Sequence, residues 1–363
     1  MWEKKNIEIH NQVQAVRDAL YDLLDIQGIY HTRKDIFIKA SPFPSIENWK
    51  EDVTGRLVPL GYFAEFEPID PTRLSGSVLV HVGKIEDLRR SQIPWTNIVL
   101  FALTVITTLS AGAIMNQVDP IAHPLLIFKG ASFALPLLLI LSVHEFGHYV
   151  ESRRNGIKVS LPYFIPGPTL FGTFGAVIRS KSPFRNRRDL LDVGAAGPIA
   201  GFVVSIAAVV IGLYHSRIIP EVSGEGLLLG DSLIFKALSY LVLKEVPSGH
   251  TVLLSPTAFA GWAGILVTML NLLPIGQLDG GHIMYALLGK VQRRVATVAT
   301  VALIPLGVFL WQGWFVWIVL VLLIKIAHPP TLDDQIPLDT KRKVVGWLAM
   351  LIFVLSFTPV PIK

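Results

Sequence analysis

Apolar and polar positions divide the chain into two parts of different character. Residues 1–90 mix apolar and charged positions as a water-exposed domain does, whereas most of 93–361 falls into long apolar runs. A run of about 20 apolar residues is long enough to cross a bilayer as a helix. The pattern therefore predicts a small soluble domain over 1–90, followed by a polytopic, all-α membrane domain over 91–363.

The soluble part carries the periodicities of a small α+β domain. Apolar positions at helical spacing predict a helix over 6–27, and a second helix is expected over 45–59, opened by a Ser-Ile-Glu-Asn cap. Strands are expected over 35–40, 61–67 and 76–82. Such a domain could regulate access, present a substrate, bind a partner or only stabilise the chain, and the pattern favours none of these roles.

Seven apolar runs are candidates for membrane crossings. They cover, in order, residues 93–115, 125–143, 190–213, 255–273, 295–311, 314–327 and 344–360. The fifth and sixth runs flank Gly313 and are short, so they predict either two crossings or one tight hairpin, and the total is six or seven. The interrupted run 227–243 is expected to lie at the membrane surface.

Composition and charge support this division. The chain is 52% hydrophobic and 16% charged, with a mean hydropathy of +0.53, whereas soluble domains are about 25% charged. Fifteen basic residues lie in the loops on one side of the runs and three lie in the loops on the other. The positive-inside bias therefore predicts seven crossings with 1–90 in the cytoplasm, and this placement argues against nucleic-acid binding. The chain contains no cysteine, which excludes disulfides and thiolate ligands.

The second apolar run ends in His-Glu-Phe-Gly-His, residues 144–148. In a helix, His144 and His148 lie one turn apart on the same face, at a spacing that holds one metal ion. Glu145 would project beside that ion, where it could take a proton from a bound water. Because eight uncharged residues precede the motif, we expect this chemistry to occur inside the membrane.

A catalytic zinc site usually has three side-chain ligands, so a third ligand must lie elsewhere in the chain. Most later carboxylates and imidazoles fall in loops, but Asp279 follows an apolar span in the sequence NLLPIGQLDGGH. Pro274 and Gly276 are expected to break the helix there. A carboxylate at membrane depth is costly unless it is paired or bound to metal. We therefore predict Asp279 as the third ligand, with His282 as the competing candidate.

Together, these motifs resemble those of the site-2 protease family, which are intramembrane zinc metalloproteases. HEFGH matches the HExxH motif of that family, and Asn271, Pro274 and Leu278-Asp279-Gly280 match its N-x-x-P…L-D-G motif. The resemblance covers about 136–282 and is closest to the branch with plant-plastid and cyanobacterial members. No inserted PDZ domain is recognisable. Two further stretches, GTFGAV at 172–177 and AAGPIAGF at 195–202, resemble the re-entrant segment and the G-P-x-x-G helix of the family.

The resemblance implies an enzyme that hydrolyses peptide bonds within or near membrane-spanning segments, with its core at 125–292. One zinc ion would be held by His144, His148 and Asp279, with Glu145 as general base. Asn271 would bind the substrate backbone or the developing oxyanion. The re-entrant, β-like segment would pair with an extended substrate as an added strand through Gly172, Thr173, Phe174 and Gly175. A water channel lined by 160–181 would open to the cytoplasmic side.

Three other functions compete with this interpretation. In a metal-ion transporter, intramembrane His and Glu side chains would conduct the ion, but that needs several polar positions along the helices. A Ste24-type zinc protease would take its third ligand from a helical Glu, and no Glu follows Glu145 in the apolar runs. A catalytically inactive scaffold would not need the complete motif set. The expected partners are a transmembrane protein substrate and lipid, with a regulator or substrate contacting 1–90.

Overall fold

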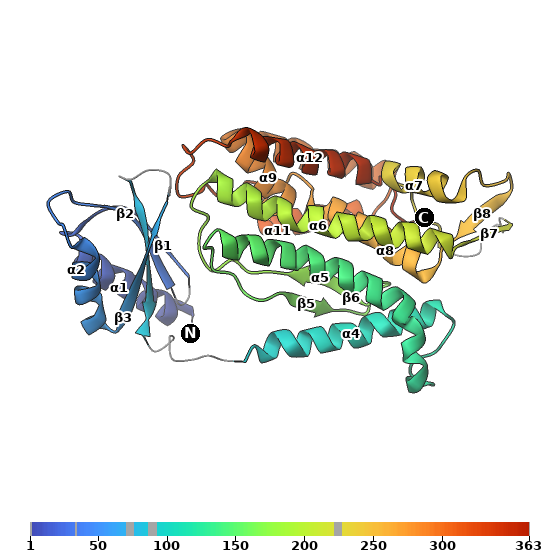
Figure 1. The fold of residues 1–363 in the computed structure, drawn as a ribbon, viewed down its shortest axis with the longest axis horizontal. Helices are drawn as coiled ribbons and strands as arrows, with labels where there is room; N and C mark the ends of the chain where they lie inside the picture. The colour runs from blue at the N-terminus through green and yellow to red at the C-terminus, as the bar shows by residue number, and fades with distance from the viewer. Residues whose placement is uncertain (1, 33–34, 70–75, 86–92, 221–226, 363) are drawn as a thin grey trace. The chain divides into compact units, whose positions relative to one another are not determined.

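The computed structural model describes residues 2–32, 35–69, 76–85, 93–220 and 227–362 (Figure 1). It divides into two compact units. The first, here called the sheet unit, comprises Met1–Ile93, Ser180–Arg187 and Pro330–Pro337. The second, here called the helical unit, comprises Pro94–Arg179, Arg188–Pro329 and Leu338–Lys363. Each unit is described by itself.

The sheet unit contains an antiparallel four-stranded sheet in the order β1-β2-β4-β3. Alternation of side chains gives each strand one apolar face, and that face packs against two helices around Val16, Leu20 and Leu57. The elements are α1 Trp2–Leu20, β1 Leu24–His31, β2 Asp35–Pro42, α2 Trp49–Leu57, η1 Val58–Leu60, β3 Tyr62–Pro68 and β4 Val78–Lys84.

The opposite face of this sheet packs against residues 330–337, and Asn186 of another late segment, residues 180–187, donates to the Ile69 carbonyl at 3.2 Å. Phe37 and Leu79 form a second buried cluster with Ile69, Leu332 and Ile336. The two late segments also bond to each other, because the Leu332 N–H donates to the Phe184 carbonyl at 3.0 Å. The sheet unit is therefore built from three separate stretches of sequence, each of which contributes to its core or its hydrogen bonds.

Ile336→Ala should destabilise the sheet unit by about 2–5 kcal/mol, because Ile336 is 2% exposed and its removal leaves a cavity against Phe37. Hydrogen exchange of the β2 and β4 amides would measure the loss. Leu60→Ala, at a position that is 49% exposed, is the control and should change stability by at most about 0.5 kcal/mol. Unchanged exchange in the Ile336 variant would show that residues 330–337 do not support the sheet.

The structure confirms three predicted strands to within two residues but corrects the first predicted helix. That helix was expected to reach residue 27, yet α1 ends at Leu20 and a strand begins at Leu24. Leu23 and Leu24 are both buried in the core that α1 also faces, so the helical spacing of apolar positions continues after the helix has ended. The second helix starts at Trp49 rather than at the predicted Ser cap, and its N-cap makes no side-chain bond.

The helical unit holds the long apolar helices. Its elements are α4 Trp95–Met115, η2 Pro124–Gly130, α5 Ala131–Arg154, β5 Tyr163–Pro166, β6 Thr173–Val177, α6 Arg187–Tyr214, β7 Arg217–Pro220, α7 Leu233–Leu243, β8 His250–Leu253, α8 Pro256–Asn271, α9 Asp279–Leu288, η3 Gly289–Val291, α10 Gln292–Phe309, α11 Trp314–Ile324 and α12 Thr340–Ser356.

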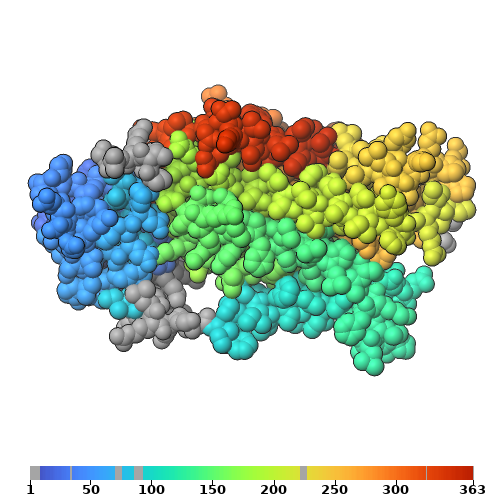
Figure 2. Space-filling model, in the orientation of Figure 1, coloured from blue at the N-terminus to red at the C-terminus, as the bar shows by residue number. Residues whose placement is uncertain are grey.

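Figure 2 shows α5, α6 and α12 as adjacent bands of side chains on one face. Gly147 of α5 meets the backbone of α6, and Arg342 of α12 pairs with Asp192 of α6 at 2.7 Å.

Among the described residues, four helical stretches are long and apolar enough to cross a membrane: 95–115, 124–154, 187–214 and 279–309. The protein is accordingly an integral membrane protein with a mostly helical membrane part and a small sheet domain. The other predicted crossings correspond to shorter helices, with 16 residues in α8, 11 in α11 and 17 in α12. Their length alone does not separate six crossings from seven.

At the centre of the helical unit lies α8, which is buried along most of its length and packs against α5. A proline in α5 strengthens this contact. Pro136 has no N–H to donate to the carbonyl of Ser132, and the Thr257 hydroxyl of α8 donates to that carbonyl instead, at 2.8 Å. The contact fixes α5 against α8 near the start of the helix that carries the HEFGH motif.

A short hairpin lies between α4 and α5 (Figure 1). Its strands β5 and β6 pair in antiparallel fashion, with Phe164 opposite Ala176. Gly172 precedes β6 with a φ of +73°, and a Cβ there would lie 2.4 Å from the carbonyl oxygen of Thr107 in α4. Glycine therefore lets the hairpin approach α4 closely, and the β-like character predicted for this segment is present.

Candidate metal centre

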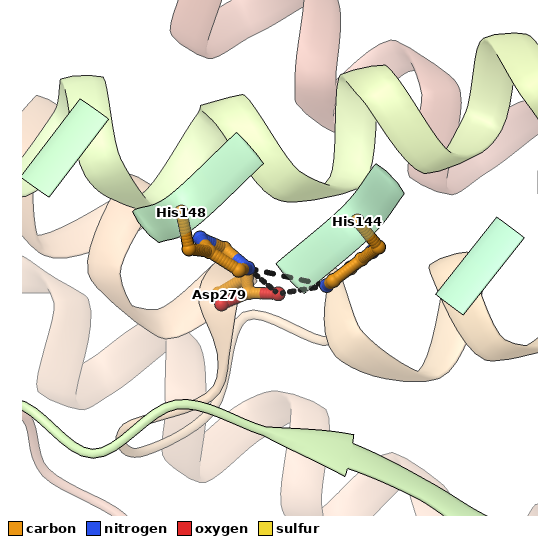
Figure 3. Close-up of side chains that lie close together, drawn as sticks. All are labelled: His144, His148 and Asp279. Carbon is orange, nitrogen blue, oxygen red and sulfur yellow. Dashed lines mark hydrogen bonds and ion pairs between the residues drawn. The ribbon is translucent and has the colours of Figure 1, made fainter. Parts of the chain in front are cut away.

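Three side chains from two distant helices meet in the helical unit. His144 and His148 lie one turn apart on α5, and Asp279 is the first residue of α9. Figure 3 shows the three side chains pointing toward one another. The Nε2 atoms of the two histidines are 3.1 Å apart, and each is 3.3 Å from Oδ2 of Asp279. The structure thus brings together all three ligands that the sequence predicted.

A sharp turn between α8 and α9 positions the carboxylate. α8 ends at Asn271, and Gly276 adopts a φ of +56° while its N–H donates to the Ile326 carbonyl at 2.9 Å. Beyond the turn, a Cβ at Gly280 would lie 2.0 Å from the Leu272 oxygen, so only glycine fits there. Asp279 therefore begins α9 at a defined place, and its side chain is 17% exposed.

The spacing and chemistry of these donors fit zinc. Zinc binds His nitrogen and carboxylate oxygen at about 2.0–2.2 Å, so two donors of a tetrahedral site lie about 3.3 Å apart. The three separations here, 3.1 to 3.3 Å, match that value. The histidine side chains are only 5% and 11% exposed, which keeps them away from bulk water. Two imidazoles and one carboxylate are a donor set typical of catalytic zinc sites, in which water takes the fourth position.

A backbone carbonyl orients one of the imidazoles. Nδ1 of His148 lies 2.8 Å from the carbonyl oxygen of Val193 in α6, and only an N–H can bond to that acceptor. In the neutral ring the proton is therefore on Nδ1 and the lone pair is on Nε2, the atom that faces Asp279. Sequence reasoning did not identify Val193, because a carbonyl acceptor does not depend on the side chain of its residue.

The predicted base lies beside the ligands. Glu145 is 5% exposed and close enough to His144, His148 and Asp279 to interact with their charges. Its carboxylate also lies close to the backbone of Ile178, the residue after β6. The hairpin thus ends next to the side chain that was predicted to move protons.

Asn271 and His282, two further residues singled out in the sequence, lie in different surroundings. Nδ2 of Asn271 is 3.3 Å from Nε2 of His144, at the metal side of that ring. Nδ1 of His282, the competing ligand candidate, is 2.6 Å from Nε2 of His328 instead. Among the described residues, the cluster placed to hold a metal consists of His144, His148 and Asp279, without His282.

The four predicted substrate-binding residues lie at the start of β6 and just before it. Thr173 is buried, and its hydroxyl donates to the Ile165 carbonyl at 2.8 Å across the hairpin. Phe174 points outward and is 67% exposed. Gly175 has a φ of +99°, and a Cβ there would meet no atom within 4 Å. The outer side of this short strand is therefore open near Gly175.

Similarity to known proteins covers the region of the chain that contains the metal-site residues. The model of peptidase family M50 matches residues 132–311, which include all three metal-site residues, Glu145 and Asn271. A probable zinc metalloprotease of Arabidopsis thaliana, EGY2, chloroplastic, is 32% identical over 65% of this chain and 43% of its own length. A second from the same plant, EGY1, is 33% identical over 68% of this chain and 46% of its own length.

A rice relative, the probable zinc metalloprotease EGY3 of Oryza sativa subsp. japonica, is 27% identical over 75% of this chain and 50% of its own length. The chain thus spans about half the length of the curated relatives it matches, or less. The matched region contains the HExxH motif, the N-x-x-P…L-D-G motif and the convergent site that they build. The resemblance seen in these motifs is confirmed, because residues 132–311 match the model of peptidase family M50.

Proposed function

We propose that this protein is an intramembrane zinc metalloprotease that cuts membrane-protein substrates within or near their membrane-spanning segments. The observation that carries the proposal is the convergence of His144, His148 and Asp279 beside Glu145, from two helical stretches, 124–154 and 279–309, that are long and apolar enough to span a bilayer. Buried polar groups at membrane depth are costly, so a cluster of four titratable side chains there points to a functional site.

His144, His148 and Asp279 would hold one zinc ion, and the other residues would act around it. Zinc, when bound, lowers the pKa of a coordinated water to about 7 and polarises the scissile carbonyl. Glu145 would accept the proton of the attacking water and return it to the leaving amine. Its burial beside the Ile178 backbone would limit the movement of the carboxylate during both transfers.

The hairpin is the proposed substrate contact. An extended substrate would add as a strand along β6 through Gly172, Thr173, Phe174 and Gly175. Its peptide groups would then lie beside a strand whose end, at Val177, is close to Glu145. Residues 160–181 would line the polar path by which water reaches the site. A helical substrate must unwind locally first, because its peptide bonds are otherwise closed by helical hydrogen bonds.

The three chain segments that form the sheet unit support a topology of seven membrane crossings. Residues 1–93, 180–187 and 330–337 form one compact unit, so all three lie on the same side of the membrane and an even number of crossings separates each from the next. Two crossings, α4 and α5, lie between the first and second segments, and four crossings, α6, α8, α10 and α11, lie between the second and third. With α12 the total is seven. A total of six would count α10 and α11 as one crossing and leave an odd number between the second and third segments.

The basic loops place that side in the cytoplasm, or in the equivalent compartment. In this topology residues 1–90 form an accessory domain and 91–363 form the protease domain, whose core is 125–292. The accessory domain would contact a regulator or the substrate. The substrate class is a transmembrane protein, and lipid surrounds the long apolar helices.

Asn271→Ala should lower kcat by about 10²–10³-fold with zinc retained, as expected for loss of one donor to a developing oxyanion. Once a metal occupies Nε2 of His144, the neighbouring Asn271 amide is available to the substrate. Initial rates with a membrane-spanning peptide would measure the effect. Asn155→Ala, at the end of α5, is the control and should leave kcat unchanged. Wild-type turnover by the Asn271 variant would assign that side chain a purely structural role.

A metal-ion transporter is the alternative, and one experiment separates it from a protease. The purified protein would be reconstituted in liposomes with a set of single-span substrates, and both cleavage and zinc uptake would be followed. We expect cleavage that a zinc chelator abolishes and added zinc restores, with no uptake. Zinc uptake without cleavage would overturn the proposal. Among the described residues a single cluster is placed to hold a metal, whereas a transport path needs several such positions.

A further inference from the structure

One face of α6 carries glycine wherever the residues of the metal centre pack against it. Gly194, Gly197 and Gly201 are spaced i, i+3 and i+7, so they lie along one stripe of the helix. A Cβ built at Gly194 would lie 2.9 Å from Cβ of His282 and 3.6 Å from the Asp279 carbonyl oxygen. This part of the stripe therefore faces the first turn of α9.

The other two glycines lie directly against the metal-site histidines. A Cβ at Gly197 would be 2.2 Å from Nε2 of His148, and one at Gly201 would be 3.0 Å from Cβ and 3.1 Å from Nδ1 of His144. The first distance is far shorter than any stable contact of a Cβ atom, and the second is at the lower limit. The two imidazoles thus occupy space that a side chain on α6 would need.

We propose that Gly197 and Gly201 are positioning residues of the metal centre, which seat the imidazoles of His148 and His144 against the backbone of α6. The inference rests on the proposed function, because it assumes that these histidines bind zinc. The second observation behind it is the bond from Nδ1 of His148 to the Val193 carbonyl, one turn before Gly197. A methyl group at 197 would push the ring away from this acceptor and move Nε2 from its place.

These contacts differ from ordinary glycine packing between helices. A Cβ at Gly212, on the same helix, would meet the backbone of Ala258 in α8 at 2.1 Å, and neither backbone can rotate away. The His148 ring can rotate away from a methyl group at 197, and Cβ of His144 needs to give by only a few tenths of an ångström to a methyl group at 201. Zinc-free protein can make both adjustments, whereas bound metal would fix both rings, so the loss falls mainly on metal binding. A metal site tolerates ligand displacements of only about 0.2 Å.

The test compares Gly197→Ala and Gly201→Ala with a matched control in the full chain, purified in detergent. The control is Gly346→Ala, because its Cβ would lie 3.0 Å from Cδ1 of Leu191, as close as that of Gly201 to His144. Zinc affinity is measured by competition with a chelator, and Tm is measured with and without zinc. Absorption of the Co²⁺-loaded protein reports the ligand geometry.

We expect both glycine variants to bind zinc about 10–100-fold more weakly, the usual cost of disturbing the partners of a metal ligand. The zinc-free Tm of Gly201→Ala should stay near wild type, and that of Gly197→Ala should fall modestly with the lost bond to Val193. In both variants the Tm rise caused by zinc should shrink and the Co²⁺ spectrum should change. Gly346→Ala should keep wild-type affinity and the wild-type Co²⁺ spectrum. If Gly197→Ala does not fold, Gly201→Ala decides, because its contact is milder.

Negative results of two kinds have different meanings. Wild-type zinc affinity and an unchanged Co²⁺ spectrum in the glycine variants would overturn the positioning role and leave the proposed function intact. An equal fall in Tm with and without zinc, at wild-type affinity, would also overturn it and assign the glycines to helix packing. Failure of the wild-type protein itself to bind zinc, or unchanged affinity in His148→Ala, would instead overturn the proposed function.

Discussion

Glu145→Gln should lower the rate of substrate cleavage by about 10²–10⁴-fold and leave zinc binding intact. Glutamine keeps the shape of the side chain beside the Ile178 backbone, but it cannot take a proton from water at neutral pH. His144, His148 and Asp279 are unchanged in this variant. Single-turnover cleavage of a membrane-spanning substrate and the zinc content of the purified protein would measure the two effects.

Glu151→Gln is the matched control for this variant. Glu151 lies on the same helix, but its carboxylate pairs with Arg154 at 3.4 Å and belongs to no metal-site contact in the structure. Its replacement should change neither cleavage nor zinc content. Cleavage at the wild-type rate by Glu145→Gln would rule out general-base catalysis by this residue and with it the proposed mechanism.

Asp279→Ala should weaken zinc binding by more than about 100-fold, because loss of an outer-shell partner alone costs about 10–100-fold and this change removes a ligand. Cleavage should fall with it. Asp279 also lies 3.3 Å from both histidines, so its removal leaves their Nε2 atoms without the carboxylate that faces them. Zinc titration by chelator competition, with Tm measured with and without zinc, would separate lost affinity from lost folding.

Asp192→Asn controls for the general effect of removing a carboxylate from this region. Asp192 pairs with Arg342 at 2.7 Å and joins α6 to α12, and its side chain is 16% exposed, much like that of Asp279. This variant should lose stability but keep wild-type zinc affinity. Full zinc affinity in Asp279→Ala would refute the assignment of the third ligand and reopen the case for His282.

The metal site could be predicted from sequence because local rules determine most of it. Helical periodicity alone puts His144 and His148 on one face, and the cost of an unpaired carboxylate in an apolar region directs attention to Asp279. Pro274 and Gly276, shortly before Asp279, predict the break between α8 and α9. What could not be predicted is the contribution of α6, since the Val193 carbonyl and the space above Gly197 depend on how two helices pack.

The sheet unit shows the opposite case. Its strands β2, β3 and β4 follow from alternation, but β1 was missed because Leu23 and Leu24 continue the apolar spacing of α1. No local pattern indicates that residues 180–187 and 330–337 complete this unit, because only long-range packing brings Leu332 and Ile336 to Phe37. Periodicity identifies the face of a strand that is buried, but not the segment that buries it.

The discontinuous core of the sheet unit sets an order for biosynthesis. Phe37 and Leu79 leave the ribosome early, yet Leu332 and Ile336, which cover them, follow roughly 250 residues later, on the order of 10–50 s at about 5–20 residues per second. During that interval one face of the sheet exposes apolar side chains while the membrane helices are being made and inserted. In the proposed topology, completion of the sheet unit is thereby coupled to correct insertion, because a helix inserted in the wrong orientation would leave residues 330–337 on the wrong side of the membrane.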